Sequence, residues 1–244
     1  MRTTHSRVLL AVLAITLAGC GDDDDDSHAA APSSPGIFIG SMRTQSGAVA
    51  LNTTVIAANG RSTVSFEERS DIVTSVATGT TEGKTLSGSL YRTGTAPENV
   101  SIDDTDTNAD TLTGKVSSTQ LTGTFILNRE TPLDVPATLS AVAATYRFVG
   151  PDQLTWRATI AADGAITASS GNCTFTGSTS LPSNQHNTYV LELKAGTCAP
   201  FGGSVTAVAF LDAIPAGGQP ASSPTLRVVY AANNAPVDLL WFRQ

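Results

Sequence analysis

The sequence predicts an all-β protein in which a signal peptide and a disordered tether precede two tandem antiparallel up-and-down β-barrel or sandwich domains of about eight strands each. From residue 36 onward, short segments of alternating apolar and polar residues are separated by turn residues at intervals of about 8 to 12 positions. The chain is rich in Thr, Ser, Gly, Val and Ala and poor in Lys, Glu and Gln, which favours strands over helices. The tetrapeptides at residues 57–60 and 161–164, Ala-Ala-Asn-Gly and Ala-Ala-Asp-Gly, lie 104 positions apart and indicate a duplication.

The first predicted domain covers residues 36–130. Its eight strands are expected near residues 37–43, 48–58, 61–67, 72–79, 84–93, 98–104, 111–117 and 120–128. In the last of these segments, the residues expected on the buried face are Leu121, Gly123, Phe125 and Leu127, which alternate with Thr122, Thr124 and Ile126. Successive side chains of a strand point to opposite faces, so the first set should line a core.

The second predicted domain covers residues 140–244 and follows a linker at residues 128–139 that contains Pro132 and Pro136. Its strands are expected near residues 144–149, 154–160, 165–170, 173–180, 189–194, 203–212, 225–231 and 236–243. Two of these strands should each bury one face, formed by Leu154, Trp156, Ala158 and Ile160 in the first and by Tyr189, Leu191 and Leu193 in the second. The repeated Asn-Gly and Asp-Gly pairs predict hairpins with type I′ turns, because both central residues of that turn have positive φ.

The N-terminus has the parts of an export signal. Arg2 and Arg7 precede an apolar run at residues 8–17, which is too short to span a bilayer, and small residues follow it. The sequence Leu-Ala-Gly-Cys at residues 17–20 resembles the lipobox of bacterial lipoproteins. The resemblance implies that residues 1–19 are removed and that Cys20 carries the lipid. Gly21 in place of Asp implies, by enterobacteria-like sorting, release to the outer membrane; the periplasmic and surface-exposed faces remain open.

Residues 20–35 are expected to form the tether. The run of five aspartates at residues 22–26 is followed by Ser, Ala and Pro, a composition that cannot bury enough apolar surface to fold. Removal of residues 1–19 leaves 12 basic and 21 acidic residues, a net charge of −9, of which the aspartate run supplies −5. Lys and Arg are therefore scarce, and nucleic acid is excluded as an expected partner because phosphate binding depends on clustered cations.

Cys173 and Cys198 remain once Cys20 is assigned to the lipid. In an oxidising periplasm or on the cell surface a disulfide between them would persist, and we predict this bridge. The closed loop of about 25 residues would add about 3 kcal/mol to stability by the chain-entropy estimate. A redox-active pair is the alternative, but the two residues do not form a Cys-x-x-Cys motif.

The sequence offers little catalytic material, and we expect no enzyme and no cofactor. After processing only His28 and His186 remain, too few for a multi-histidine metal site, and no Gly-x-Ser-x-Gly motif is present. His186 is expected to be an exposed loop residue. The adjacent Glu67 and Glu68 could act as acid and base, but with no known cleft we interpret them as surface charge.

One acidic segment is a weak calcium candidate. Asp104, Asp106, Asn108 and Asp110 place oxygen-bearing side chains at alternate positions, as calcium loops do. The EF-hand pattern fails, because Ala109 replaces the turn glycine and Lys115 the bidentate glutamate. The alternative is a polar hairpin tip in which Asp and Asn side chains cap their own turn.

Aromatic residues concentrate in the second half. Five of them have two interpretations, as core residues or as the lining of a small-ligand cavity: Trp156, Phe175, Tyr189, Tyr230 and Trp241. Eight-stranded barrels can hold one small ligand, so sequence leaves both interpretations open.

The whole chain resembles proteobacterial lipoproteins in which an anchored tether carries one or more small β-barrel domains. This resemblance implies an outer-membrane protein held by lipid on Cys20. Our leading hypothesis is a non-enzymatic lipoprotein whose β domains bind a macromolecular partner, either a protein or a glycan, in capture, adhesion or scaffolding. The alternative is a carrier of a small apolar ligand inside the second barrel.

Replacement of the lipobox cysteine tests the anchor. Cys20→Ser should release the protein from the membrane fraction into the soluble fraction, because a lipid chain on this residue is the only expected attachment. Membrane association that persists in Cys20→Ser cells, after export of the variant has been verified, would contradict the prediction.

Overall fold

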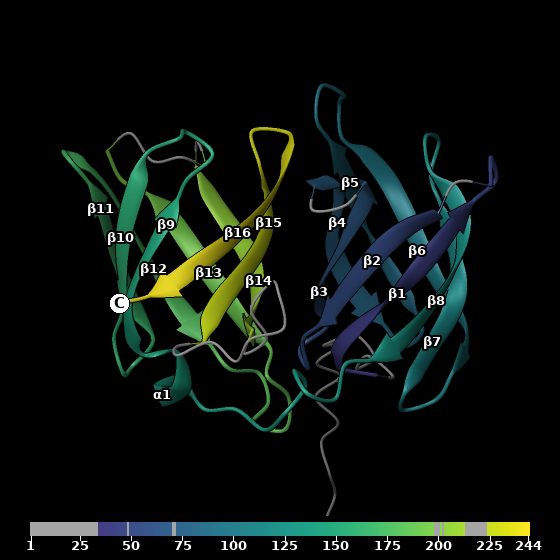
Figure 1. Cartoon of the computed structure of the whole chain (residues 1–244), viewed down its shortest axis with the longest axis horizontal. Helices are drawn as coiled ribbons and strands as arrows, with labels where there is room; N and C mark the ends of the chain where they lie inside the picture. Colours follow the sequence, from purple (N-terminus) through teal and green to yellow (C-terminus); the bar gives the residue numbers. More distant parts are fainter. Residues whose placement is uncertain (1–33, 48, 70–71, 198–200, 202, 213–223) are drawn as a thin grey trace, which may run out of the picture.

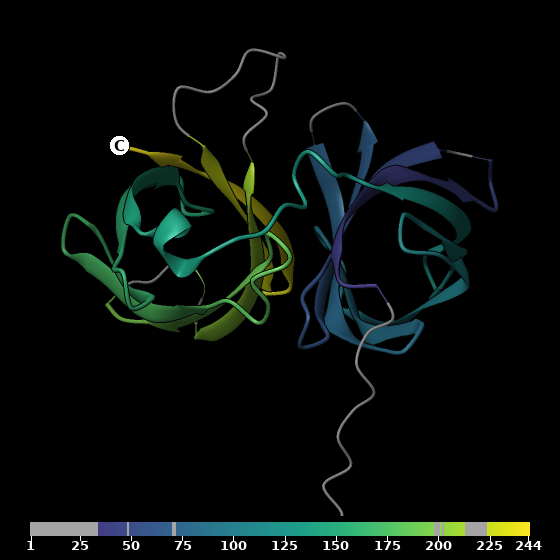
Figure 2. The same cartoon turned by 90° about the horizontal axis from the view of Figure 1, so that it is seen from below.

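The computed structural model describes residues 34–47, 49–69, 72–197, 201, 203–212 and 224–244. The predicted signal peptide, Cys20, the aspartate run and Cys198 lie outside these residues. The described chain forms two closed antiparallel β-barrels that stand side by side, as the end-on view in Figure 2 shows. The predicted all-β class with tandem up-and-down barrels is confirmed.

The first barrel consists of β1 to β8, and each strand pairs with the next in sequence order. The strands are β1 (Gly36–Thr44), β2 (Val49–Ile56), β3 (Arg61–Arg69), β4 (Ile72–Glu82), β5 (Thr85–Arg92), β6 (Glu98–Thr107), β7 (Thr111–Ser117) and β8 (Thr122–Arg129). Pairing of β1 with β8, from Phe38 opposite Arg129 to Thr44 opposite Gly123, closes the sheet. Closure leaves no free strand edge in this barrel.

The second barrel repeats this order with β9 to β16 (Figure 1). Its strands are β9 (Ala144–Val149), β10 (Thr155–Ile160), β11 (Ala165–Ser170), β12 (Cys173–Ser180), β13 (Tyr189–Ala195), β14 (Ser204–Asp212), β15 (Thr225–Ala232) and β16 (Ala235–Arg243). Closure depends on β9 and β16, where Phe242 lies opposite Arg147 and Arg243 opposite Tyr146. Between the barrels, a one-turn helix α1 (Leu139–Val142), which sequence did not predict, begins after Thr138.

Every predicted strand is present, but one residue that the sequence predicted to be buried is exposed. Trp156, Ala158 and Ile160 point into the second barrel as expected, whereas Leu154 precedes β10 and is 43% exposed. Leu154 belongs to the β9–β10 turn, in which its carbonyl accepts a hydrogen bond from the Gly150 N–H (2.9 Å). The alternating pattern therefore extended one residue beyond the strand.

The repeated hairpins have the same turn in both barrels, but it is not the predicted type I′. Gly60 and Gly164 have φ values of +83° and +87°, while Asn59 and Asp163 do not have positive φ. In each hairpin the glycine N–H donates to the carbonyl three residues earlier at 2.9 Å, on Ala57 or Ala161. This is a three-residue loop in which a type I turn is followed by a left-handed glycine. Positive φ at two successive central residues occurs instead at Asn233 and Asn234, between β15 and β16.

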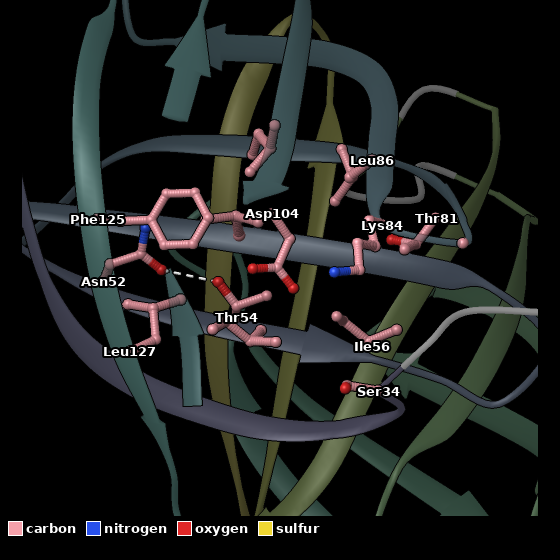
Figure 3. Close-up of a pocket in the computed structure, with 14 residues that line it drawn as sticks. Ser34, Asn52, Thr54, Ile56, Thr81, Lys84, Leu86, Asp104, Phe125 and Leu127 are labelled. Carbon is pink, nitrogen blue, oxygen red and sulfur yellow. Dashed lines mark hydrogen bonds between the residues drawn. The ribbon is translucent and has the colours of Figure 1, made fainter. Parts of the chain in front are cut away.

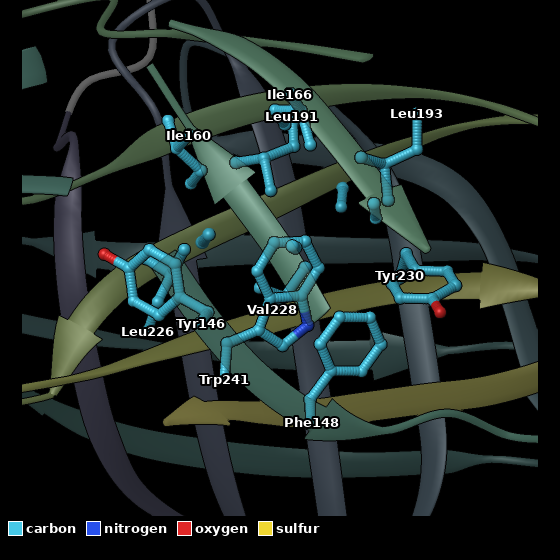
Figure 4. Packing of buried hydrophobic residues seen from close by; sticks show 14 of the residues in the cluster. Tyr146, Phe148, Ile160, Ile166, Leu191, Leu193, Leu226, Val228, Tyr230 and Trp241 are labelled. Atoms are coloured by element: carbon cyan, nitrogen blue, oxygen red, sulfur yellow. The ribbon is translucent and has the colours of Figure 1, made fainter. Parts of the chain in front are cut away.

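The interior of the second barrel is filled by large side chains (Figure 4). Trp241 stacks on Phe148 with ring centroids 4.5 Å apart and an interplanar angle of 5°. Phe175 contacts Trp156 (centroids 5.2 Å apart) and Phe201 (5.1 Å). Such offset and edge contacts stabilise aromatic pairs beyond their buried area, so these rings form a connected core.

Smaller residues line part of the first barrel. Gly79 and Gly88 are direct neighbours on β4 and β5, and a Cβ on either would collide with the backbone of the opposite strand. Paired glycines at such a position allow the strong bending that closure of a small sheet requires. The core of this barrel combines aliphatic residues with Phe38, Phe66 and Phe125, and contains no tryptophan.

The barrels pack against each other through an apolar cluster on their outer walls. Ile37 and Val55 of the first barrel meet Val208 and Phe210 of β14, and Leu133 of the linker completes the cluster. All five are nearly inaccessible to solvent. Beside this cluster, Val190 on β13 is also buried, although the alternating pattern placed it on the exposed face. The outer face is buried there because β13 pairs with β14, whose outer face contacts the first barrel.

Polar contacts near this interface show that two predictions from sequence, for Glu67 and for His186, were wrong. Glu67 is not simple surface charge, because its carboxylate pairs with Arg227 of β15 at 3.1 Å, and Arg227 also binds Asp238. His186 is not an exposed loop residue. Its side chain is 21% exposed and its Nδ1 lies 3.1 Å from the buried carboxylate of Asp134 in the linker.

A matched pair of glycine substitutions tests the repeated hairpin. Gly164 and Gly171 both have positive φ, but only at Gly164 would a Cβ collide with the Thr179 carbonyl, since nothing lies within 4 Å at Gly171. Gly164→Ala should lower the free energy of unfolding by about 1–3 kcal/mol more than Gly171→Ala. Urea unfolding followed by tryptophan fluorescence reports on this barrel, because both tryptophans lie in it. Equal losses in the free energy of unfolding would show that a collision with the Thr179 carbonyl does not affect stability.

Candidate functional site

A small cavity lies inside the first barrel near one end (Figure 3). Its volume is about 40 Å³, and its walls are mainly apolar. The apolar lining consists of Ile56, Val64, Leu86, Ile102, Leu112, Phe125 and Leu127. Sites for drug-sized ligands have volumes of roughly 300–1,000 Å³, whereas one water molecule needs about 10–15 Å³. In this conformation the cavity therefore accommodates a few water molecules rather than a whole ligand.

Polar groups reach into this cavity from β2. Asn52 and Thr54 occupy inward positions on the strand, and Thr54 Oγ1 donates a hydrogen bond to Asn52 Oδ1 (2.8 Å). Asn52 is 1% exposed, and its Nδ2 has no hydrogen-bond partner among the described residues. A buried amide donor of this kind favours a bound water molecule or a small polar group as its acceptor.

Two charged residues also line the cavity. In Figure 3 the amino group of Lys84 and the carboxylate of Asp104 both point into it. They come from adjacent segments, because the Asp104 N–H donates to the Lys84 carbonyl (2.9 Å). Asp104 Oδ1 accepts a hydrogen bond from the Thr113 N–H (3.2 Å), which fixes its orientation. The lining also includes the hydroxyl groups of Ser34, Thr54 and Thr81, and among the described lining residues there is no histidine and no second carboxylate, so the arrangement can orient a polar molecule by charge and hydrogen bonds.

The five aromatic residues considered for a ligand cavity are all fully buried in the second barrel. Trp156, Phe175, Tyr230 and Trp241 contact other aromatic rings, and Tyr189 packs within the same buried cluster, so their surfaces are largely occupied. Burial raises the pKa of Tyr146 and of Tyr189 to about 12. Tyr230 has its pKa raised as well, by burial and by the nearby charge of Asp152. Trp241 Nε1 is buried without a hydrogen-bond partner among the described residues.

Tyr146 and Tyr189 connect the inner wall of the barrel to the linker. The hydroxyl of Tyr146 donates to the Val142 carbonyl (2.8 Å), and that of Tyr189 donates to the Thr138 carbonyl (3.2 Å). Both acceptors belong to α1 or its N-cap. These tyrosines therefore act as structural donors that hold the short helix over one end of the barrel.

The four residues of the calcium candidate have different surroundings. Asp104 points into the cavity, and Asn108 accepts hydrogen bonds from the N–H groups of Asp110 (2.8 Å) and Thr111 (2.7 Å). Asp110 has an exposed side chain 3.9 Å from Arg129, and the side chain of Asp106 is outside the described part. The turn-capping interpretation is confirmed for Asn108. Among the described residues, no three or more His, Cys, Asp or Glu side chains gather into a metal site.

The predicted disulfide stays a prediction, because Cys198 lies outside the described residues. The neighbouring backbone is consistent with it. Thr174, directly after Cys173, donates its N–H to the Thr197 carbonyl (3.0 Å), and Thr197 Oγ1 donates to the Asn172 carbonyl (2.9 Å). Thr197 directly precedes Cys198. The residues that flank the two cysteines are thus paired.

An apolar and cationic surface lies on the outer wall of the second barrel where β9 meets β16. Val149, Leu240 and Phe242 are 54%, 42% and 54% exposed, unlike the other large apolar residues of these two strands. Arg147 is the cross-strand neighbour of both Phe242 and Arg157. The two arginines are exposed, and neither has an ion pair among the described residues. We refer to these five residues as the β9–β16 patch.

Sequence reasoning did not identify this patch or the cavity residues Asn52 and Lys84. Phe242 and Leu240 alternate with Trp241 and Arg243 in the last segment, but no local signal showed which face was outside. The two arginines lie ten positions apart and meet only through the register of β9 with β10. Asn52 and Lys84 are brought together by closure of the sheet.

The buried tyrosines predict instability of the second barrel at alkaline pH. Tyr146 and Tyr189 have pKa values raised from 10 to about 12, so the folded chain binds their protons more tightly than the unfolded chain does. Their contribution is fully present below pH 10 and is lost as the pH rises towards 12. The free energy of unfolding should fall by about 1.4 kcal/mol per pH unit for each tyrosine in that window.

Urea unfolding at successive pH values, followed by tryptophan fluorescence, measures this slope. Tyr189→Phe should give a shallower decline than the unchanged protein, because it removes one of the three buried tyrosines of this barrel whose pKa is raised. An identical slope in the variant would contradict the assignment.

Among the described residues, no helix has the length and apolar character needed to cross a membrane. Comparison with protein-family models found no match, and comparisons with curated proteins and with solved structures found none either.

Proposed function

We propose that this protein is a non-enzymatic lipoprotein of the bacterial outer membrane, anchored through lipid on Cys20, whose β domains bind a macromolecular partner. The observation that carries the proposal is the β9–β16 patch. Large apolar side chains on the outer wall of a closed barrel gain nothing from the core of that barrel, and clustered exposed apolar residues mark interaction surfaces. The lipobox supports the anchor, and the tether at residues 20–35 would give the barrels reach.

The arginines of the patch strengthen this argument. Arg147 and Arg157 are directly opposite in the ladder, where like charges destabilise a sheet. No acidic side chain pairs with either in the described part of the chain. A partner with carboxylates beside an apolar contact would relieve this repulsion and form charge-assisted hydrogen bonds, for which arginine is well suited. We therefore propose that the partner at this patch is a protein with such a surface.

The geometry gives less support to the carrier alternative. In the second barrel the candidate lining residues pack against other side chains, and the first barrel encloses only about 40 Å³. Binding on the outer walls needs no change in either interior. The outer surfaces consequently suit a macromolecular partner better than the interiors suit an apolar ligand.

Site-specific photocrosslinking in cells tests the proposed partner surface. Phe242→p-benzoylphenylalanine should give one discrete adduct on irradiation, while the same substitution at Thr167, exposed on the outer face of β11, should give none. Arg147→Glu with Arg157→Glu should abolish the adduct, because the reversed charges would repel an acidic partner. Lys194→Glu, an exposed cation elsewhere on this barrel, is the matched control and should leave it unchanged. Equal adducts at positions 242 and 167 would contradict the proposal.

A further inference from the structure

A second surface feature lies on the first barrel, across β1, β8 and β7. It is a groove of about 300 Å³, which falls at the lower end of the range for small-molecule sites. In Figure 1, β7 and β8 lie on the side of the first barrel away from the second barrel. The groove shares no lining residue with the interior cavity or with the β9–β16 patch.

Two cationic side chains line this groove from its opposite sides. Arg43 on β1 and Lys115 on β7 are both cross-strand neighbours of Thr124 on β8. The three residues therefore form one row on the outer wall, and the Cα atoms of the two cations are about 10 Å apart, given a strand spacing of about 4.8 Å. Side chains as long as those of Arg and Lys can converge over this distance on one anionic group.

Neither cation forms an ion pair within the described part of the chain. Arg43 and Lys115 are exposed, and their side chains have no ion pair or hydrogen bond among the described residues. Asp103 is the cross-strand neighbour of Lys115 on its other side, but its two carboxylate oxygens accept hydrogen bonds from Thr85 and Ser101, each at 3.0 Å. Two unpaired cations in one groove stand out on a chain with a net charge of −7.

The remainder of the groove is lined mostly by hydroxyl groups and one amide. Gln45, Ser117 and Thr122 supply them together with Thr124, and Val116 is the one large apolar side chain of the lining. No aromatic ring is present among the lining residues, so recognition there must depend on charge and hydrogen bonds rather than on stacking. Hydroxyl-rich walls with two cations match a polyhydroxylated ligand that carries an acid group.

We propose that this groove binds an acidic sugar, a uronic acid or a sugar phosphate, as a unit of an anionic glycan. The planar guanidinium of Arg43 would bind two oxygens of the acid group, and the ammonium of Lys115 would bind a further oxygen. Thr124, between them, would donate to or accept from a sugar hydroxyl. The inference goes beyond the protein partner proposed for the β9–β16 patch and does not depend on it.

Calorimetric titration of the processed full-length protein in a neutral detergent tests the proposal. The probes are digalacturonate, glucose 1-phosphate, the neutral disaccharide maltose and inorganic phosphate. The two acidic sugars should bind, the tighter of them identifying the acid group. Maltose and inorganic phosphate should each bind at least about tenfold more weakly, because each lacks one half of the recognised chemistry. Raised salt should weaken the binding of the acidic sugars.

Matched variants locate the binding. Arg43→Gln with Lys115→Gln should reduce affinity for the acidic sugars by about tenfold or more, since each charge-assisted hydrogen bond accounts for roughly that factor. Arg147→Gln with Arg157→Gln removes the same charge from the β9–β16 patch and should leave sugar affinity unchanged. Both pairs are exposed, so thermal unfolding should match that of the unchanged protein.

Three results would overturn the proposal. They are the absence of binding by both acidic sugars, equal affinity for maltose or for phosphate alone, and undiminished binding in the Arg43→Gln, Lys115→Gln variant. Failure of the photocrosslinking experiment would bear only on the patch, because it involves different residues on a different barrel.

Discussion

Closure of an eight-stranded sheet fixes the space inside it, and the rest of this structure depends on that constraint. A barrel of this size is just wide enough for its inward side chains to meet at the axis. In the second barrel the volume is taken by stacked and tilted rings such as Trp241 and Phe148. In the first, Gly79 and Gly88 permit sharp bending, and the smaller inward residues leave a cavity of about 40 Å³. The same topology therefore gives two interiors of different character, neither with room for a drug-sized ligand.

The two barrels are then held together by side chains that point away from both interiors. Val55, Val208 and Phe210 are outward residues that become buried only because the two walls meet. Arg227 forms ion pairs with Asp238 in its own barrel and with Glu67 of the other barrel. Ion pairs at such an interface contribute specificity of docking more than net stability, since desolvation offsets much of their attraction. The apolar cluster supplies the attraction, and the charged pair favours one relative placement of the barrels.

The difference between local strand patterns and contacts between distant segments explains what the sequence could and could not predict. Alternation along each segment depends on one strand and its neighbours, so all strands and the Gly60 and Gly164 hairpins were found. The turn type was wrong because a type I turn with a following left-handed glycine uses the same residues as a type I′ turn. His186 and Glu67 were misplaced because their partners are distant in the sequence: His186 contacts Asp134 of the linker, and Glu67 contacts Arg227 of the other barrel. No local pattern encodes such a contact, and the same holds for the candidate sites, whose residues meet only through strand register.

Both proposed binding surfaces lie on the outer walls, because neither interior has room for a drug-sized ligand. The patch on the second barrel combines apolar residues with two arginines that repel each other across the ladder, and the groove on the first places Arg43 and Lys115 beside Thr124. Directly opposed like charges such as Arg147 and Arg157 reduce the stability of a sheet, so this pair is better explained by an interaction with something outside the chain than by the fold. Their chemistry differs, because one site combines cations with apolar surface and the other combines them with hydroxyl groups. A tandem of two closed barrels can thus present two distinct binding surfaces without opening either core.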